Sequence, residues 1–75
     1  MPKLPQIKPN PLIRFFQKQG FIVTRQTGSH ARLAHLDGRK ITIAIHSKPI
    51  APGTLNAILK QAKMDRNIFL KEFKK

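Results

Sequence analysis

The sequence predicts an α+β domain in which one antiparallel three-stranded sheet carries helices on one face, in the order α-β-β-β-α, with a short extra C-terminal helix. Three observations predict this class. The chain has 75 residues, of which 40% are apolar, enough for one small core and thus a single domain over residues 1–75. Apolar residues recur at helical spacing near both ends of the chain. Between those ends lie three β-branched segments separated by short turns.

The N-terminal segment predicts an extended arm followed by a helix. Residues 1–9, "MPKLPQIKP", contain three prolines and are typical of extended chain. We expect Asn10 to cap the first helix and Pro11 to take its first position. Gly20 is suited to the left-handed residue that ends a helix. The apolar residues at helical spacing between them are Leu12, Phe15 and Phe16.

The middle of the chain predicts three strands. Their expected bounds are Phe21 to Gln26, His30 to His35 and Lys40 to His46. A turn at residues 27–29 joins the first two strands, and "LDGR" joins the second and third. These connections are short enough for an antiparallel sheet with strands in sequence order.

The register of the second hairpin decides which side chains face outward. A two-residue Asp-Gly turn would set His30 and Arg32 on the same face as the isoleucines of the third strand. A three-residue loop, with Gly38 left-handed as a bulge, instead pairs Leu33 with Ile41. One face must be buried, so the hydrophobic pattern selects this second register. The expected outer face then carries His30, Arg32, Thr42, Ala44 and His46.

The C-terminal third predicts two helices. An amphipathic helix is expected to begin near Pro52 to Thr54, and its core residues are Leu55, Ile58, Leu59 and Ala62. Asp65 is suited to cap a short last helix from Arg66 to about Phe73.

The charge of the chain indicates an anionic partner. Fifteen Lys and Arg residues face three carboxylates, giving a net charge of +12 and a pI near 11.5. This excess fits nucleic acid, an anionic membrane surface or an acidic protein. No apolar run approaches the length of a membrane span, and no secretory signal precedes the domain, so cytoplasmic residence is expected.

The sequence does not predict a metal centre, a cofactor or a catalytic triad. The chain has no cysteine, and its three imidazoles, His30, His35 and His46, have no carboxylate partners at metal-ligand spacing. Its glycines form no phosphate-binding loop. Ser29 and His30 are adjacent, so in extended chain their side chains would point to opposite faces.

The outer face suits cleavage of RNA without a metal. That reaction needs a base for the ribose 2′-OH, cations for the charge on phosphorus and an acid for the leaving oxygen. His30 is the candidate acid or base, aimed by a turn at Gly28 and Ser29. The candidate RNA-binding residues are Arg25, Ser29, Arg32, Lys40 and His46. Two alternatives remain at this point: a non-catalytic RNA-binding module that uses the same face, and a structural partner of an acidic protein.

Several motifs resemble one known family. They are "GF" at 20–21, "VTRQTGSH" at 23–30, "DGR" at 37–39 and "PGTLNAILKQA" at 52–62. Over about residues 4–73 the chain resembles the HicA toxins of HicA–HicB toxin–antitoxin systems. The resemblance implies a fold like the double-stranded-RNA-binding domain, ribosome-independent cleavage of mRNA with His30 as the catalytic residue, and inhibition by a HicB-like antitoxin that covers the active face. Leu36 and Ala44 depart from the family's pattern, since proline is common at both positions.

Overall fold

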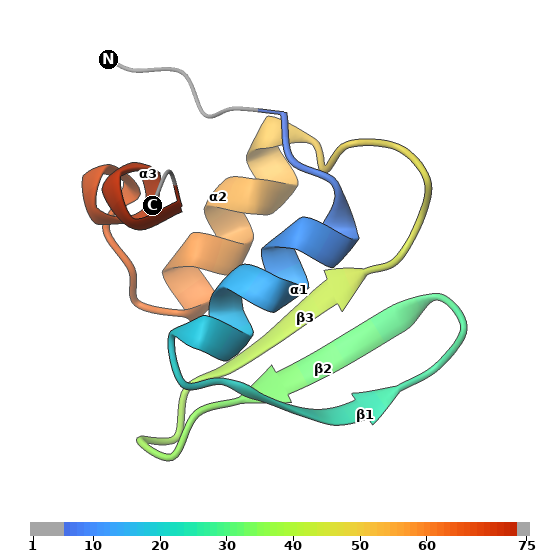
Figure 1. The fold of residues 1–75 in the computed structure, drawn as a ribbon, viewed down its shortest axis with the longest axis horizontal. Helices are drawn as coiled ribbons and strands as arrows, with labels where there is room; N and C mark the ends of the chain where they lie inside the picture. The colour runs from blue at the N-terminus through green and yellow to red at the C-terminus, as the bar shows by residue number, and fades with distance from the viewer. Residues whose placement is uncertain (1–5, 74–75) are drawn as a thin grey trace.

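The fold is the predicted α-β-β-β-α arrangement followed by a third helix (Figure 1). A computed structural model describes residues 6–73, so the first five residues of the expected arm lie outside the described part. The elements are α1 (Pro9–Lys18), β1 (Ile22–Gln26), β2 (His30–Ala34), β3 (Lys40–Ala44), α2 (Pro52–Gln61) and α3 (Arg66–Phe73). The strands form one antiparallel sheet in the order β1-β2-β3, which confirms the predicted fold class.

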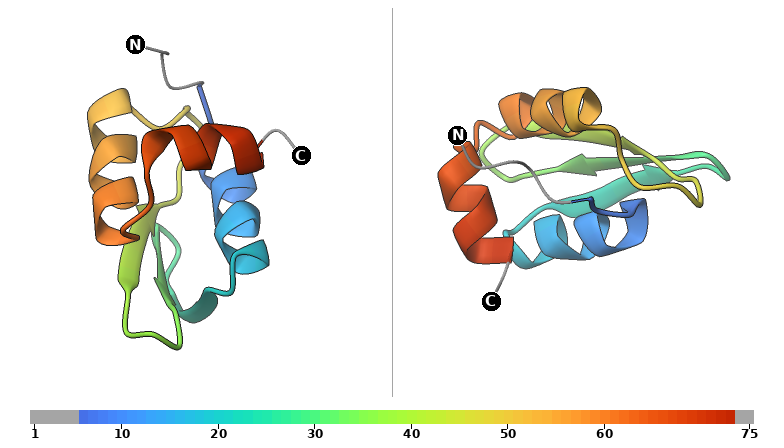
Figure 2. Two further views of the ribbon diagram at one scale, coloured as in Figure 1. Left: turned by 90° about the vertical axis from the view of Figure 1, so that its left-hand side faces the viewer. Right: turned by 90° about the horizontal axis from the view of Figure 1, so that it is seen from above.

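Helices α1 and α2 lie over the same face of the sheet, and α3 crosses one end of the pair (Figure 2). The core fills the space between them and includes the predicted core residues of α1 and α2. Its members are Ile7, Leu12, Ile13, Phe15, Phe16, Phe21, Ala31, Leu33, Ile41, Ile43, Ile50, Leu55, Ile58, Leu59, Ala62 and Phe69. No helix of the described residues covers the opposite face of the sheet, which is where the candidate site lies.

Helix α1 begins two residues before the position expected from Asn10 and Pro11. Its first residue is Pro9, and its N-cap is Lys8, which makes no side-chain capping hydrogen bond, so the predicted Asn10 cap is wrong. Proline is compatible with the first turn of a helix because its fixed φ is helical and its missing N–H has no partner there. Just before the helix, Ile7 is buried and its carbonyl accepts a hydrogen bond from the Ile50 N–H at 2.8 Å. Through this contact, the end of the expected arm packs as part of the core.

The register of β2 and β3 is the predicted one. Leu33 pairs with Ile41, and Ala31 pairs with Ile43, so all four residues face the helices. Gly38 adopts a φ of 99°, and its N–H donates to the His35 carbonyl at 2.9 Å. A left-handed φ is strained for residues with a Cβ, so glycine is required at this point. β1 is one residue shorter than expected at its start, and β2 and β3 are shorter at their ends.

Strand β1 carries an irregularity that the sequence did not predict. Val23 pairs with Leu33, but Arg25 rather than Thr24 pairs with Arg32, so Thr24 is an extra residue in the ladder. In a regular ladder Arg25 would face the same side as Val23, toward the core. The bulge therefore turns Arg25 to the outer face, beside Arg32.

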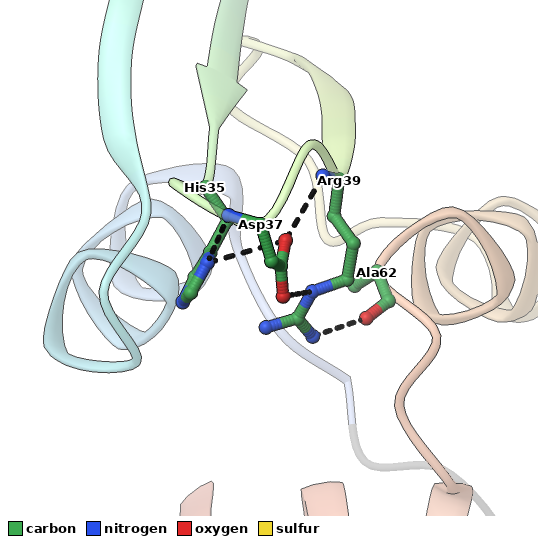
Figure 3. Close-up of polar contacts among 4 residues, drawn as sticks. All are labelled: His35, Asp37, Arg39 and Ala62. Atoms are coloured by element: carbon green, nitrogen blue, oxygen red, sulfur yellow. Dashed lines mark hydrogen bonds and ion pairs between the residues drawn. The ribbon is translucent and has the colours of Figure 1, made fainter.

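The tip of the β2–β3 hairpin is fastened to the end of α2 by polar contacts (Figure 3). Asp37 accepts hydrogen bonds from the Arg39 backbone N–H at 3.0 Å and from Arg39 Nε at 2.7 Å. Arg39 Nη1 in turn donates to the Ala62 carbonyl at 2.6 Å, at the C-cap of α2. The guanidinium also lies over the ring of Phe21, 5.1 Å from its centroid. One arginine thus joins the hairpin, α2 and the start of β1.

The contacts of Asp37 change its acidity. The backbone hydrogen bond from Arg39 holds the pKa of Asp37 below its ordinary value; desolvation opposes this lowering, and the Arg39 side chain and the charge of His35 add to it. His35 lies beside this carboxylate, with Nδ1 at 3.2 Å from Oδ1, and its ring packs edge-on against Phe21. The histidine is therefore part of the hairpin support rather than of the outer face.

The short helix α3 is capped as predicted. Asp65 Oδ1 accepts a hydrogen bond from the Asn67 N–H at 2.7 Å. The helix buries Phe69, whose ring meets that of Phe15 edge-on at 5.1 Å and stacks on Phe73 at 5.4 Å. These aromatic contacts attach α3 to α1. Among residues 6–73, no helix is both long and apolar enough to cross a membrane.

Candidate active site

The outer face of the sheet contains a shallow groove of about 380 Å³ around His30. The groove is lined by Arg25, Thr27, His30, Arg32 and Thr42, which come from all three strands and the turn between β1 and β2. The imidazole therefore lies on the solvent side of the sheet, as the hairpin register predicted. Beside it the groove offers two guanidinium groups and two hydroxyl groups.

His30 is held at the first position of β2 by Thr27. The Thr27 N–H donates to the His30 carbonyl at 2.9 Å, closing the turn at residues 28 and 29. The Thr27 hydroxyl oxygen accepts from the His30 N–H at 3.1 Å and lies 3.3 Å from the His30 carbonyl oxygen, to which it donates. The backbone that carries the imidazole is thus fixed on both sides, while the ring itself remains exposed.

Ser29 contacts the imidazole directly, contrary to the expectation from alternation. Ser29 Oγ lies 3.1 Å from His30 Nδ1, within hydrogen-bond distance. Opposite faces apply only to extended neighbours, and Ser29 lies in the bend before β2 rather than in the strand. The contact occupies Nδ1, and within the part of the chain that the structure describes Nε2 has no hydrogen-bond partner. A bond at one ring nitrogen selects the protonation state of the other.

Gly28, the other residue of this turn, does not need to be glycine for the fold. Unlike Gly20 and Gly38, it does not have a positive φ. A Cβ built at Gly28 would meet no atom within 4 Å. The open space beside Gly28 leaves its backbone accessible at the edge of the site.

Arg25 and Arg32 are cross-strand partners on the outer face. Like charges in directly opposed positions destabilise a sheet unless an anion lies between them. The described carboxylates are engaged elsewhere: Asp37 bonds Arg39, Asp65 caps α3, and Glu72 lines a separate groove between α1 and α3. No described carboxylate lines the His30 groove, so its positive charge is not offset by the protein.

The other predicted site residues lie outside this groove. Lys40 lines a second groove on the same face, which shares Arg32 and Thr42 with the first. His46 lies beyond the end of β3, in a third, more apolar groove with Lys48 and the start of α2. The structure thus brings together His30, Arg25 and Arg32, sets Lys40 beside them and separates His46 from them.

Two groove residues, Thr27 and Thr42, were not among the predicted site residues. Alternation places Thr42 on the outer face, but a hydroxyl there carries no functional signal by itself. Thr27 precedes a two-residue turn, and threonine in that position often bonds the backbone, which is the signal that points to it. The outward direction of Arg25 depends on the bulge, for which the sequence has no signal.

Within residues 6–73, no three His, Cys, Asp or Glu side chains gather closely enough to hold a metal ion.

The fold and the groove define a class of protein: a small basic α+β domain that presents an imidazole and paired arginines on the open face of its sheet. The sequence matches the family model described as HicA toxin of bacterial toxin-antitoxin over residues 10–64, well over half of the chain. The chain belongs to this HicA toxin family, so it is a toxin component with an antitoxin as its partner. A comparison with curated proteins gave no match. Helix α3 lies outside the matched residues.

Proposed function

We propose that this toxin is an endoribonuclease that cleaves mRNA without a metal, with His30 as its catalytic residue. The observation that carries the proposal is the exposed imidazole in a groove whose other charged residues, Arg25 and Arg32, are cations without a carboxylate partner there. An anionic phosphodiester is the ligand that this arrangement favours. The mRNA substrate would place the protein in the cytoplasm.

The reaction follows from the chemistry of these side chains. His30 Nε2 removes the proton of a ribose 2′-OH, whose oxygen bonds to the adjacent phosphorus. The P–O5′ bond breaks, and an imidazolium or water protonates the leaving 5′-oxygen, so the products are a 2′,3′-cyclic phosphate and a 5′-hydroxyl. Arg25 and Arg32 stabilise the charge that develops on the phosphoryl oxygens. DNA lacks the 2′-hydroxyl and is not a substrate for this route.

The proposed antitoxin is an acidic, HicB-like protein that covers the outer face of the sheet. This proposal is supported by the family, by the net charge of +12 and by the position of all the described helices on the other face. The same cations would then bind either RNA phosphates or antitoxin carboxylates. Bound antitoxin inhibits by excluding RNA from the groove.

Cleavage of single-stranded RNA in the presence of EDTA tests the activity. We expect the wild-type chain to cleave and His30→Ala to lose cleavage, because general acid–base catalysis contributes typically ~10²- to 10⁴-fold. His30 is exposed, so its removal should not unfold the protein, which circular dichroism and thermal melting check. His30→Gln provides a second variant that keeps a polar side chain of similar size.

Three outcomes decide between the alternatives. Cleavage by the wild type that both variants lose, with retained RNA binding, supports the nuclease. Undiminished cleavage by either His30 variant contradicts its catalytic role. Binding of RNA by the wild type with no cleavage between about pH 5 and 9 favours a non-catalytic RNA-binding module.

A further inference from the structure

We infer that the groove beside the His30 groove is a second nucleotide subsite, in which Lys40 binds the neighbouring phosphate of the same RNA strand. The inference rests on the proposed RNA ligand and adds that recognition extends over at least two consecutive phosphates. It arises from a surface feature that the chemistry at His30 does not use.

The two grooves are neighbours on the outer face and share lining residues. The second groove, of about 360 Å³, is lined by Thr24, Arg32, Leu33, Ala34, Lys40, Ile41 and Thr42. Arg32 and Thr42 also line the first groove and therefore form the shared wall. A chain molecule that leaves the first groove past Arg32 enters the second without crossing a barrier of core side chains.

The spacing of cations along the sheet suits a single strand. On β2 and β3 the outward-facing pairs are His30–Ala44, then Arg32–Thr42, then Ala34–Lys40. Each step covers two residues of a strand, or about 6.7 Å. Imidazole, guanidinium and ammonium groups therefore follow one another at regular steps. The row formed by His30, Arg32 and Lys40 is suited to successive phosphates of one strand.

The far end of the second groove also offers an apolar surface. Ile22 is the cross-strand partner of the groove residue Ala34, and 60% of its surface is exposed. An exposed isoleucine on the functional face has no role in the core. Next to a phosphate held by Lys40, it provides an apolar contact for the base or the ribose of the nucleotide that follows this second phosphate. No exposed aromatic side chain is needed for this contact.

Binding of uncleavable ligands tests the subsite apart from the chemistry. The probes are a 2′-O-methyl dinucleotide, which has one phosphate, and a 2′-O-methyl trinucleotide, which has two, each titrated into ¹⁵N-labelled protein and followed by NMR. We expect the wild type to bind the trinucleotide about fivefold more tightly, the contribution of one exposed charge pair. Lys40→Gln should lose this gain while binding the dinucleotide as the wild type does. The matched control Lys60→Gln removes the same charge from α2, on the helical side, and should keep the gain.

A second variant tests the apolar contact. Ile22→Thr keeps a β-branched side chain in β1 and should weaken the trinucleotide while leaving the dinucleotide unchanged. The subsite is overturned if the wild type gains nothing from the second phosphate, or if Lys40→Gln and Lys60→Gln weaken both ligands alike. Neither probe can be cleaved, so the binding result does not depend on catalysis. If His30 variants still cleaved RNA, the proposed role of His30 would fail while the subsite could still be confirmed. If the subsite failed this test, the proposed nuclease activity would be unaffected.

Discussion

At the scale of single residues, the site depends on how one imidazole is held. Thr27 fixes the backbone of His30, and Ser29 contacts Nδ1 of its ring at 3.1 Å. With Nδ1 engaged, Nε2 is the nitrogen that can exchange a proton with a ligand in the groove. Ser29 is therefore a positioning residue in the proposed reaction, because it acts through His30 rather than on the substrate.

Replacing Ser29 tests this role. Ser29→Ala should lower the cleavage rate by about fivefold, within the range of one neutral hydrogen bond, and Ser29→Thr should restore most of it because threonine keeps the hydroxyl. Long-range ¹H–¹⁵N NMR spectra of the neutral imidazole should show one dominant tautomer in the wild type and a mixture in Ser29→Ala. An unchanged tautomer ratio, with a rate equal to that of the wild type, would show that the contact has no role.

At the scale of elements, the β2–β3 hairpin presents the site, and its tip is held in place from the other side of the molecule. Arg39 connects Asp37 to the Ala62 carbonyl at the end of α2 (Figure 3). Its guanidinium also lies over the ring of Phe21. The hairpin strands carry Arg32 and Lys40 outward and Leu33 and Ile41 inward. The orientation of the outer face therefore depends on the contacts of the hairpin tip with α2 and Phe21, and on the packing of Leu33 and Ile41 against the helices.

The acidity of Asp37 makes this connection sensitive to pH. Since the folded state lowers the pKa of Asp37, its contribution to stability is fully present above the unfolded pKa and is lost as the pH falls through the lower folded value. Asp37→Asn should therefore have a smaller free energy of unfolding than the wild type at about pH 7, and the difference should shrink toward about pH 3. Urea unfolding across this range measures it. A difference that is the same at both ends would show that the ionised carboxylate contributes nothing.

At the scale of the whole molecule, the two faces of the sheet have different roles. The helices bury the apolar face, and the open face carries the arginine pair formed by Arg25 and Arg32. The helical side also has exposed cations, among them Lys18 and Lys60. Net charge attracts any polyanion from a distance, whereas the open face determines where the polyanion binds.

The salt dependence of RNA binding separates these two effects. In a His30→Ala background, the logarithm of the binding constant should fall linearly with the logarithm of salt concentration, by ~0.7 for each phosphate bound on a single strand. Replacing both Arg25 and Arg32 with glutamine should reduce the slope by about 1.4. Replacing Lys18 and Lys60 with glutamine removes equal charge from the helical side and should leave the slope nearly unchanged. Equal reductions in both double variants would indicate binding by net charge alone.

Much of the molecule was determined by the sequence alone, because it depends on local periodicity and on burial. The alternation of Leu33, Ile41 and Ile43 permits only the register with Gly38 as the left-handed residue, since any other register exposes apolar side chains. That register is also what turns His30 and Arg32 outward. The same local rules predicted the Asp65 cap and the left-handed Gly20 that follows α1.

Other features depend on contacts between segments that are distant in the sequence, and only the tertiary structure determines them. Helix α1 starts at Pro9 because Ile7 is buried beside Ile50, which no local cap signal reveals. The bulge at Thr24, which appears only in the pairing of β1 with β2, turns Arg25 outward. Periodicity can tell which face of a strand is apolar, but only the packed chain determines which polar groups come to lie within reach of one ligand.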